Sequence, residues 1–110
     1  MRSLTKRRDF ELVLKEGVTL SSDYLVIYAR PNELKFNRLG LSVSKKIGNA
    51  VTRNRIKRLL REALMKTLFG LPYHYDFVIV AKKLSVGVGL NDFIRDINKF
   101  KDNISLTHLS

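Results

Sequence analysis

The segment from Lys45 to Arg61 constrains this chain more than any other part of the sequence, because it combines a helical pattern with concentrated positive charge. Apolar residues recur at the three- and four-residue spacing of an amphipathic helix, and they are Ile56, Leu59, Leu60, Ala63 and Leu64. The segment contains seven basic residues and no acidic one. At about 100° per residue, most of the basic residues fall opposite the apolar side. We therefore predict a helix from Ala50 to Phe69, ended by Gly70, with one packed face and one cationic face.

The charge of this segment favours an anionic partner. A solvated helix face is the ordinary explanation for a charged stripe, but such faces usually mix both signs of charge. Here no acid occurs before Glu62, so like charges three and four residues apart destabilise the free helix. The whole chain carries 21 Lys and Arg against 10 Asp and Glu, a formal net charge of +11. Because a polyanion relieves such self-repulsion, the sequence indicates nucleic acid or an anionic membrane surface as the partner.

Composition disfavours several other classes of function. The apolar face of the basic helix is needed for the core, and no run approaches the length of about 18 apolar residues that spans a bilayer, so we expect no membrane partner. The absence of cysteine excludes disulfides, thiolate zinc sites and a cysteine nucleophile. Ser42 and Ser44 have no histidine in a recognisable catalytic arrangement. We expect a soluble, cytoplasmic protein with no catalytic site, no small-molecule substrate and no cofactor of its own.

The remaining segments predict one α+β domain over residues 1–110. A helix is expected over residues 6–16, and strands are expected over 24–30, 39–44 and 76–81. Residues 18–20 could add an edge strand. A last helix is expected from Asn91 or Asp92. The resulting order, αβββαβα, predicts a small mixed four-stranded sheet packed with three helices.

Aromatic residues suggest a second binding surface. Leu25 and Ile27 alternate with the tyrosines of the first long strand, so if they face the main core, the tyrosines lie on the opposite face. Unpaired bases could stack there, although core packing is the alternative. The candidate residues are Phe10, Leu14, Tyr24 and Tyr28. Lys82 and Lys83 follow the last strand, where they either end it in solvent or extend a path of phosphate contacts.

The segment from Ser42 to Glu62 closely resembles the signature of the bacterial ribonuclease P protein family. That signature is a Lys-Lys-x-Gly loop followed by Arg-Asn-Arg-x-Lys-Arg and a further arginine on the helix. Here these residues are Lys45, Lys46, Gly48, Arg53, Asn54, Arg55, Lys57, Arg58 and Arg61. The resemblance extends over nearly the whole chain and includes Arg8-Asp9-Phe10, Arg38-Leu39-Gly40-Leu41 and residues 76–83.

The resemblance implies an α/β sandwich with a left-handed crossover between parallel strands, against the right-handed default. It also implies a non-catalytic protein subunit of ribonuclease P, whose RNA subunit uses Mg²⁺ to hydrolyse precursor tRNA and leave the mature 5′ end. By this resemblance, the residues that bind the catalytic RNA are Lys46, Arg53, Asn54, Arg55, Lys57, Arg58 and Arg61. The residues that bind the single-stranded 5′ leader of precursor tRNA are Phe10, Leu14, Tyr28, Ser44, Lys45, Lys82 and Lys83. Leu14 departs from the family pattern, which often has a second aromatic residue there.

Two alternatives stay open at this point. Charge alone would permit a ribosomal or other structural RNA-binding protein without a role in cleavage. A helix-turn-helix DNA-binding protein could use the basic helix in a major groove. The second alternative requires a short helix before Ala50, where the sequence instead predicts a strand and a loop.

Overall fold

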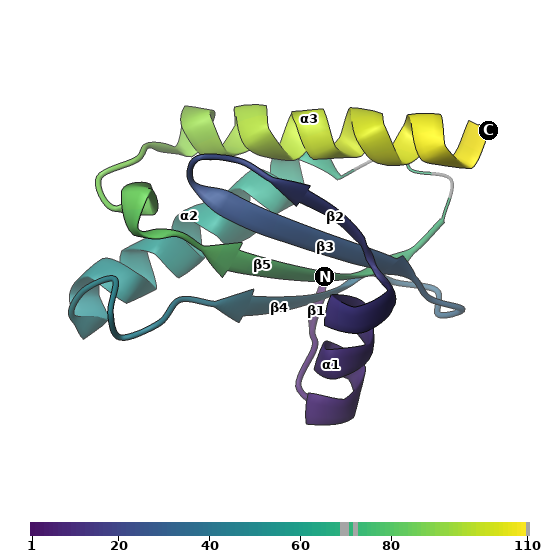
Figure 1. Ribbon diagram of the computed structural model, residues 1–110, viewed down its shortest axis with the longest axis horizontal. Helices are drawn as coiled ribbons and strands as arrows, with labels where there is room; N and C mark the ends of the chain where they lie inside the picture. The colour runs from purple at the N-terminus through teal and green to yellow at the C-terminus, as the bar shows by residue number, and fades with distance from the viewer. Residues whose placement is uncertain (69–70, 72, 110) are drawn as a thin grey trace.

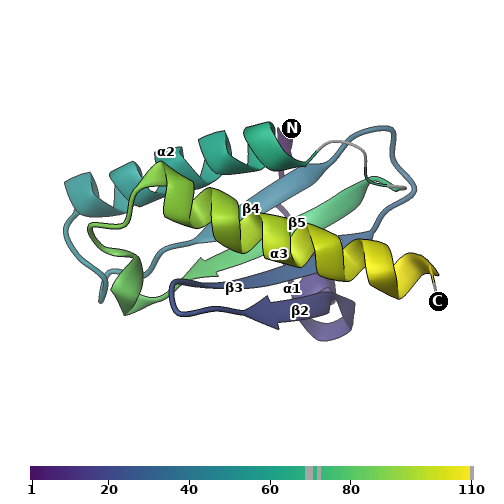
Figure 2. The same ribbon diagram turned by 90° about the horizontal axis from the view of Figure 1, so that it is seen from above.

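Five strands form one mixed sheet among residues 1–68, 71 and 73–109, which are the residues that the computed structural model describes, with side chains described as far as residue 104. In spatial order the strands are β1 (Arg2–Ser3), β4 (Arg38–Ser42), β5 (Tyr75–Ala81), β3 (Leu25–Pro31) and β2 (Val18–Ser21). Helix α1 (Arg7–Glu16) lies on one face of the sheet, and α2 (Ala50–Thr67) and α3 (Leu90–Leu109) lie on the other (Figure 1 and Figure 2). A 3-10 turn, η1 (Lys83–Ser85), follows β5.

The main core lies between the sheet and the helices α2 and α3. The side chains that fill it come from alternate strand residues and from one face of each helix. Residues at most 2% exposed in this core include Leu25, Ile27, Phe77, Ile79, Ile56, Leu60, Leu64, Phe93, Ile97 and Phe100. Burying each such side chain contributes roughly 1.5–3 kcal/mol. The predicted apolar face of the basic helix therefore packs as its spacing indicated.

The number of strands differs from the prediction. The expected edge strand is confirmed as β2, but the sheet has five strands rather than four because Arg2 and Ser3 form β1 beside β4. The backbone N–H groups of Arg2 and Leu4 donate to the carbonyls of Asn37 and Leu39 at 3.0 and 2.8 Å. Two residues are too few for an alternating pattern, so the sequence gives no sign of this strand. The predicted helix end at residues 69 and 70 lies outside the described residues.

The connection through α2 has the unusual hand. Strands β4 and β5 are parallel neighbours, with Arg38 beside Asp76 and Ser42 beside Val80. In Figure 2 the helix α2 lies toward the viewer, and β5 lies to the left of β4 when the strands are turned to point upward. The crossover is therefore left-handed, as the family resemblance implied and against the usual preference.

This topology positions the functional surfaces. Because β4 and β5 are parallel, the segments that follow them lie at the same end of the sheet, on the left in Figure 1. The loop into α2 follows β4, and Lys82 follows β5. The start of the basic helix and the carboxyl ends of both strands therefore converge at one end of the molecule. No helix in the described part of the chain is both long and apolar enough to cross a membrane.

Candidate nucleic-acid interface

The loop before α2 holds the start of the basic helix in a defined orientation. Asn49 caps the helix, since its Oδ1 accepts a hydrogen bond from the N–H of Thr52 at 2.9 Å. The backbone N–H of Ile47 donates to the carbonyl of Ser44 at 3.0 Å, and the Ile47 side chain packs on the main core. Arg53 Nε donates to the Gly48 carbonyl at 3.2 Å. The first turn contains no acid, so the positive end of the helix dipole is not neutralised there.

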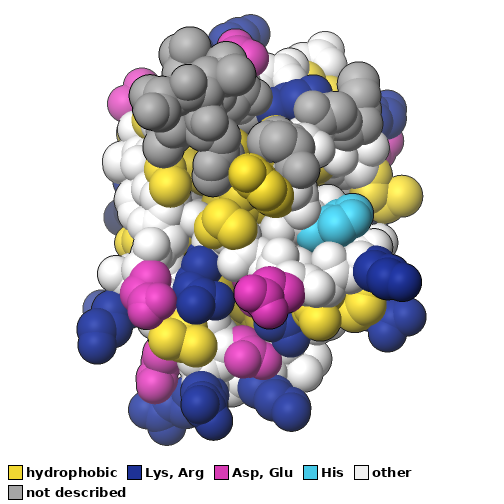
Figure 3. Space-filling view, turned by 90° about the vertical axis from the view of Figure 1, so that its right-hand side faces the viewer, with side chains coloured by type: hydrophobic (Ala, Val, Ile, Leu, Met, Phe, Trp, Pro, Cys, Tyr) yellow, Lys and Arg dark blue, Asp and Glu magenta, His cyan; other side chains and the backbone are white. Residues whose placement is uncertain are grey.

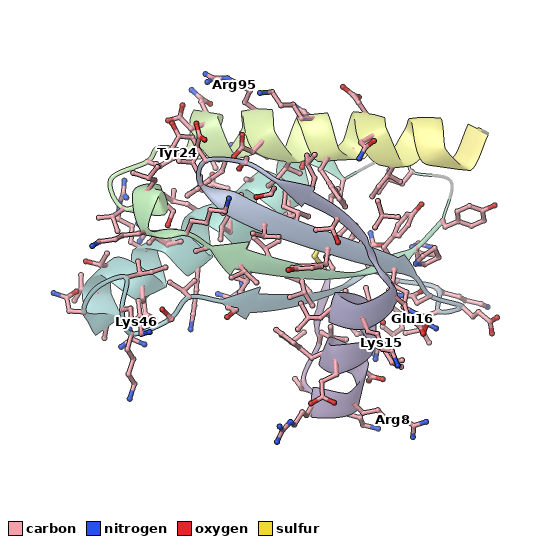
Figure 4. The ribbon with its side chains drawn as sticks, viewed as in Figure 1. Arg8, Lys15, Glu16, Tyr24, Lys46 and Arg95 are labelled. Carbon is pink, nitrogen blue, oxygen red and sulfur yellow. The ribbon has the colours of Figure 1, made fainter. Side chains whose placement is uncertain are left out.

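A cationic surface follows from this arrangement. We call it the α2 basic surface, and it consists of Lys45, Lys46, Arg53, Asn54, Arg55, Lys57, Arg58 and Arg61. Arg53 and Lys57 are half-buried at its edge, and the other six side chains are exposed. Figure 4 shows Lys46 projecting away from the loop between β4 and α2. The surface thus presents its charge to solvent.

The cations of the α2 basic surface lack acidic partners, whereas several cations elsewhere in the fold have them. Arg7 pairs with Glu11 at 2.9 Å, and Arg30 pairs with Glu16 at 3.3 Å. Within the described residues, none of the seven cations of the α2 basic surface forms an ion pair. Their charge therefore remains available to an anion from outside the protein.

A second surface lies on the sheet face that carries α1. Gly40, Val78 and Tyr28 lie side by side across β4, β5 and β3. Helix α1 covers this row with Val13, which is fully buried, and with Phe10. Gly40 permits that contact, because a Cβ atom there would lie only 2.5 Å from Cε2 of the Phe10 ring. Phe10 and Tyr28 are consequently brought together, half-buried, over the same patch of sheet.

The next row of the same face lies beyond α1. It consists of Ser42, Val80 and Val26, which are neighbours across the same strands and are all half-buried. In Figure 1, α1 lies under the right half of the sheet, and no other described helix covers this face nearer the loop into α2. We call these three residues the open sheet row. Leu14 is 40% exposed on α1, and Ser44 and Lys45 are exposed beyond β4.

The side chain of Lys82 is already hydrogen-bonded within the protein. Lys82 follows β5 at the same end as Lys45, but its Nζ donates to Ser21 Oγ at 2.6 Å and to the Ser22 carbonyl at 2.5 Å. Lys82 therefore fixes the turn between β2 and β3 and keeps one N–H for an external anion. Lys83 is exposed in η1.

The prediction that Tyr24 shares a surface with Tyr28 is wrong. Ser22 Oγ accepts hydrogen bonds from the N–H groups of Tyr24 and Leu25 at 3.3 and 3.1 Å, so Tyr24 belongs to the turn and not to the alternating strand. Its side chain packs against the main core. Figure 4 shows it near Arg95 of α3, on the side of the sheet away from α1.

The sequence did not reveal a buried charge network that anchors α1. Asp76 is 3% exposed and accepts hydrogen bonds from Arg38 Nε at 2.7 Å, Arg38 Nη2 at 2.6 Å and Asn32 Nδ2 at 2.8 Å. Arg38 also pairs with Asp9 of α1 at 3.3 Å. Hydrogen bonding to Asp76 raises the pKa of the Arg38 guanidinium, although burial opposes the rise. The signal that could have identified this ion pair is the presence of one charged residue, Arg38 or Asp76, in each of the strands β4 and β5.

The network lies at the end of the molecule opposite the α2 basic surface. Figure 3 views that end, where Asp and Glu side chains lie between Lys and Arg side chains. That end therefore mixes both signs of charge, whereas the α2 basic surface itself contains no acidic residue. A small α+β fold with an unpaired basic helix beside a partly apolar sheet face defines a nucleic-acid-binding protein.

Comparisons with known proteins identify the family. Residues 1–105 match the family model described as Ribonuclease P. The ribonuclease P protein component of Clostridium kluyveri is 40% identical over 101 residues, which cover 87% of this chain and 90% of that protein. The solved ribonuclease P protein of Thermotoga maritima has a TM-score of 0.80 and 30% identity, and the match covers 94% of this chain and 98% of that one. The Staphylococcus aureus protein has a TM-score of 0.78 and 30% identity, with 90% and 91% covered.

This chain belongs to the ribonuclease P protein family. It serves as a protein component of ribonuclease P, an endoribonuclease of tRNA processing, and RNA is its partner in that holoenzyme. The alternative of a ribosomal RNA-binding protein is thereby set aside. A strand and a turn precede α2, so the helix-turn-helix alternative also does not hold.

Proposed function

We propose that this protein is the non-catalytic subunit of ribonuclease P and that its two surfaces bind different RNAs. The α2 basic surface binds the ribonuclease P RNA. The open sheet row, with Phe10, Leu14 and Tyr28, holds the 5′ leader of precursor tRNA. The RNA subunit carries out the hydrolysis with Mg²⁺, and the protein contributes binding and orientation. On this proposal the holoenzyme is cytoplasmic, and the protein binds neither a membrane nor a small-molecule substrate.

The observation that carries the proposal is the unpaired charge of the α2 basic surface. Surface cations commonly pair with nearby acids, as Arg7 and Arg30 do here. The seven cations around α2 have no such partner among the described residues, and like charges repel when they are this close in sequence. Phosphates of a folded RNA supply the missing negative charge. Binding that neutralises about five phosphates weakens steeply as salt concentration rises.

The chemistry of the second surface supports leader binding. A single strand is bound without strong sequence preference when its bases stack on aromatic or apolar side chains and its phosphates follow cations. Phe10 and Tyr28 supply the ring surfaces, and the open sheet row continues from them toward Lys45. Ser44, Lys82 and Lys83 lie at that same end of the sheet. The leader can therefore pass from an aromatic patch to a cationic one.

Replacing Tyr28 by alanine tests this assignment. The change is expected to weaken holoenzyme binding to leader-bearing precursor tRNA by about tenfold, because stacking on an aromatic ring contributes about 1–3 kcal/mol per base. Binding to mature tRNA should be unchanged. The measurement is the dissociation constant for each RNA, with the scissile bond of the precursor modified to prevent cleavage.

The matched control for this substitution is Tyr24→Ala, which removes a tyrosine ring from the other side of the sheet. It should leave both dissociation constants near their wild-type values. Equal weakening of both RNAs by Tyr28→Ala, or the same selective effect from Tyr24→Ala, would contradict leader binding at this surface.

A further inference from the structure

We propose that Arg2 and Arg61 together form a phosphate-binding recess for the RNA partner, where β1 meets α2 at the edge of the sheet. This inference rests on the proposed function of the α2 basic surface and extends that surface onto the N-terminal strand. Neither the sequence motif nor the helix alone contains Arg2, so the site exists only because β1 pairs with β4.

The shape and lining of the recess suit one phosphate group. Its volume is about 80 Å³, room for two or three water molecules at about 30 Å³ each. Two arginines and no acid line it, and the lining residues are Met1, Arg2, Ser3, Leu39, Arg61 and Met65. Neither Arg2 nor Arg61 forms an ion pair within the described part of the chain. Two unpaired guanidinium groups on one small recess repel each other until an anion lies between them.

Arg2 is held in place before any RNA binds. Its backbone is fixed by the pairing of β1 with β4, where its N–H donates to the Asn37 carbonyl at 3.0 Å. Its Cζ lies 4.2 Å from the centroid of the Phe36 ring. Stacking uses the face of the guanidinium and leaves its N–H edge free to donate to phosphate oxygens. The neighbouring Arg38 is instead already engaged by Asp76 and Asp9.

The recess continues the α2 basic surface without a break. Arg53, Lys57 and Arg61 are four residues apart, so they lie on successive turns along one side of the helix. Arg61 is the last of them and lines the recess with Arg2. The cations therefore form a track that leaves the helix at Arg61 and crosses onto β1. An RNA backbone that follows α2 would meet Arg2 next.

The test measures affinity for ribonuclease P RNA across a range of salt concentrations. Arg2→Gln is expected to weaken binding by about tenfold, the scale of one lost hydrogen bond to a charged group. It should also lower the magnitude of the slope of log affinity against log salt by about 0.7–0.9, the value for one phosphate contact. Arg61→Gln should behave alike. The fold loss of affinity in the double variant should be smaller than the product of the two single-variant fold losses, because both residues bind one phosphate.

Two further variants separate this site from a general effect of charge. Arg7→Gln removes the same charge from α1, where the side chain is 92% exposed, and it should leave affinity and slope nearly unchanged. Phe36→Leu removes the stacking partner of Arg2 and should weaken binding in the wild-type background but not in the Arg2→Gln background. Thermal unfolding confirms that each variant is folded.

Equal effects of Arg2→Gln and Arg7→Gln on affinity would contradict the proposed phosphate site. It would also be contradicted if the affinity losses of Arg2→Gln and Arg61→Gln multiplied in the double variant. The broader proposal fails separately, if substitutions of Arg55 and Arg58 leave binding of ribonuclease P RNA intact. The two failures are therefore distinguishable in the same assay.

Discussion

Replacing Arg55 and Arg58 together by alanine is expected to weaken binding of ribonuclease P RNA by about a hundredfold. Each side chain is exposed on α2 and has no acidic partner among the described residues, so its donors are free for phosphate. A hydrogen bond to a charged group contributes about 1.5–3 kcal/mol, which corresponds to about tenfold or more for each arginine. The fold should not be weakened, because the two like charges three residues apart repel in the free protein.

The measurement is a filter-binding or fluorescence titration at several salt concentrations, with thermal unfolding as a check on folding. The magnitude of the slope of log affinity against log salt should fall by about 1.5, as expected for two lost phosphate contacts. The control is Arg7→Ala with Arg95→Ala, which removes two charges that lie elsewhere and pair with Glu11 and Asp92. Comparable losses in both double variants would show that total charge matters and the position on α2 does not.

Replacing Asp76 by asparagine is expected to lower the free energy of unfolding by about 3 kcal/mol, because it removes one partner of a buried ion pair. The Asp76 side chain is 5% exposed, and Arg38 approaches it with two nitrogens. The loss is a large part of a typical total of roughly 5–15 kcal/mol. Since Arg38 also holds Asp9, the change should loosen α1 over the sheet face that carries Phe10.

Urea denaturation measures this effect, and Glu16→Gln is the matched control. Glu16 pairs with Arg30 at 3.3 Å, but its side chain is 46% exposed, so the pair is screened by water. The control should change the free energy of unfolding by less than about 1 kcal/mol. A similarly small change for Asp76→Asn would show that the buried network does not stabilise the fold.

The parts of the fold that the sequence predicted are those with a local signal. The spacing of Ile56, Leu60 and Leu64 predicts one buried face of α2, and alternation in β3 predicts which of its side chains enter the main core. The short apolar run of β5 predicts a buried strand. These patterns depend on residues a few positions apart, so neighbouring residues suffice to recognise them. The basic helix was predictable for the same reason, and its amphipathic division is confirmed.

The features that the sequence did not reveal depend on contacts between distant segments. Strand β1 has two residues and exists because β4 offers it an unpaired edge. The bond from Lys82 to the turn before β3 and the pair between Arg38 and Asp76 each join segments far apart in the chain. Tyr24 was misplaced because the Ser22 hydroxyl accepts hydrogen bonds from the N–H groups of Tyr24 and Leu25, so β3 begins one residue later than predicted. Such details follow from tertiary packing.

If the proposed function holds, the organisation of the molecule explains how one small chain would bind two RNAs. Because α2 follows β4 and the strands β4 and β5 are parallel, the start of α2 lies beside the carboxyl ends of both strands (Figure 1). The α2 basic surface and the open sheet row therefore meet at Ser44 and Lys45, between the helix and the sheet. A substrate leader on the sheet and a catalytic RNA on the helix would be held next to each other. Their mutual repulsion would be screened by the cations between them.

The central proposal is tested most directly by an assay of precursor tRNA cleavage. Bacterial ribonuclease P RNA is incubated with labelled precursor tRNA at low Mg²⁺, with and without this protein. At low Mg²⁺ the RNA alone lacks enough cations to offset repulsion between the two RNAs, so we expect little product. Adding the protein should restore cleavage at the mature 5′ end, and the Arg55 and Arg58 double variant should require far more protein to do so. The protein without the RNA should produce no cleavage. Unchanged processing at every protein concentration, or cleavage by the protein alone, would contradict the proposed role.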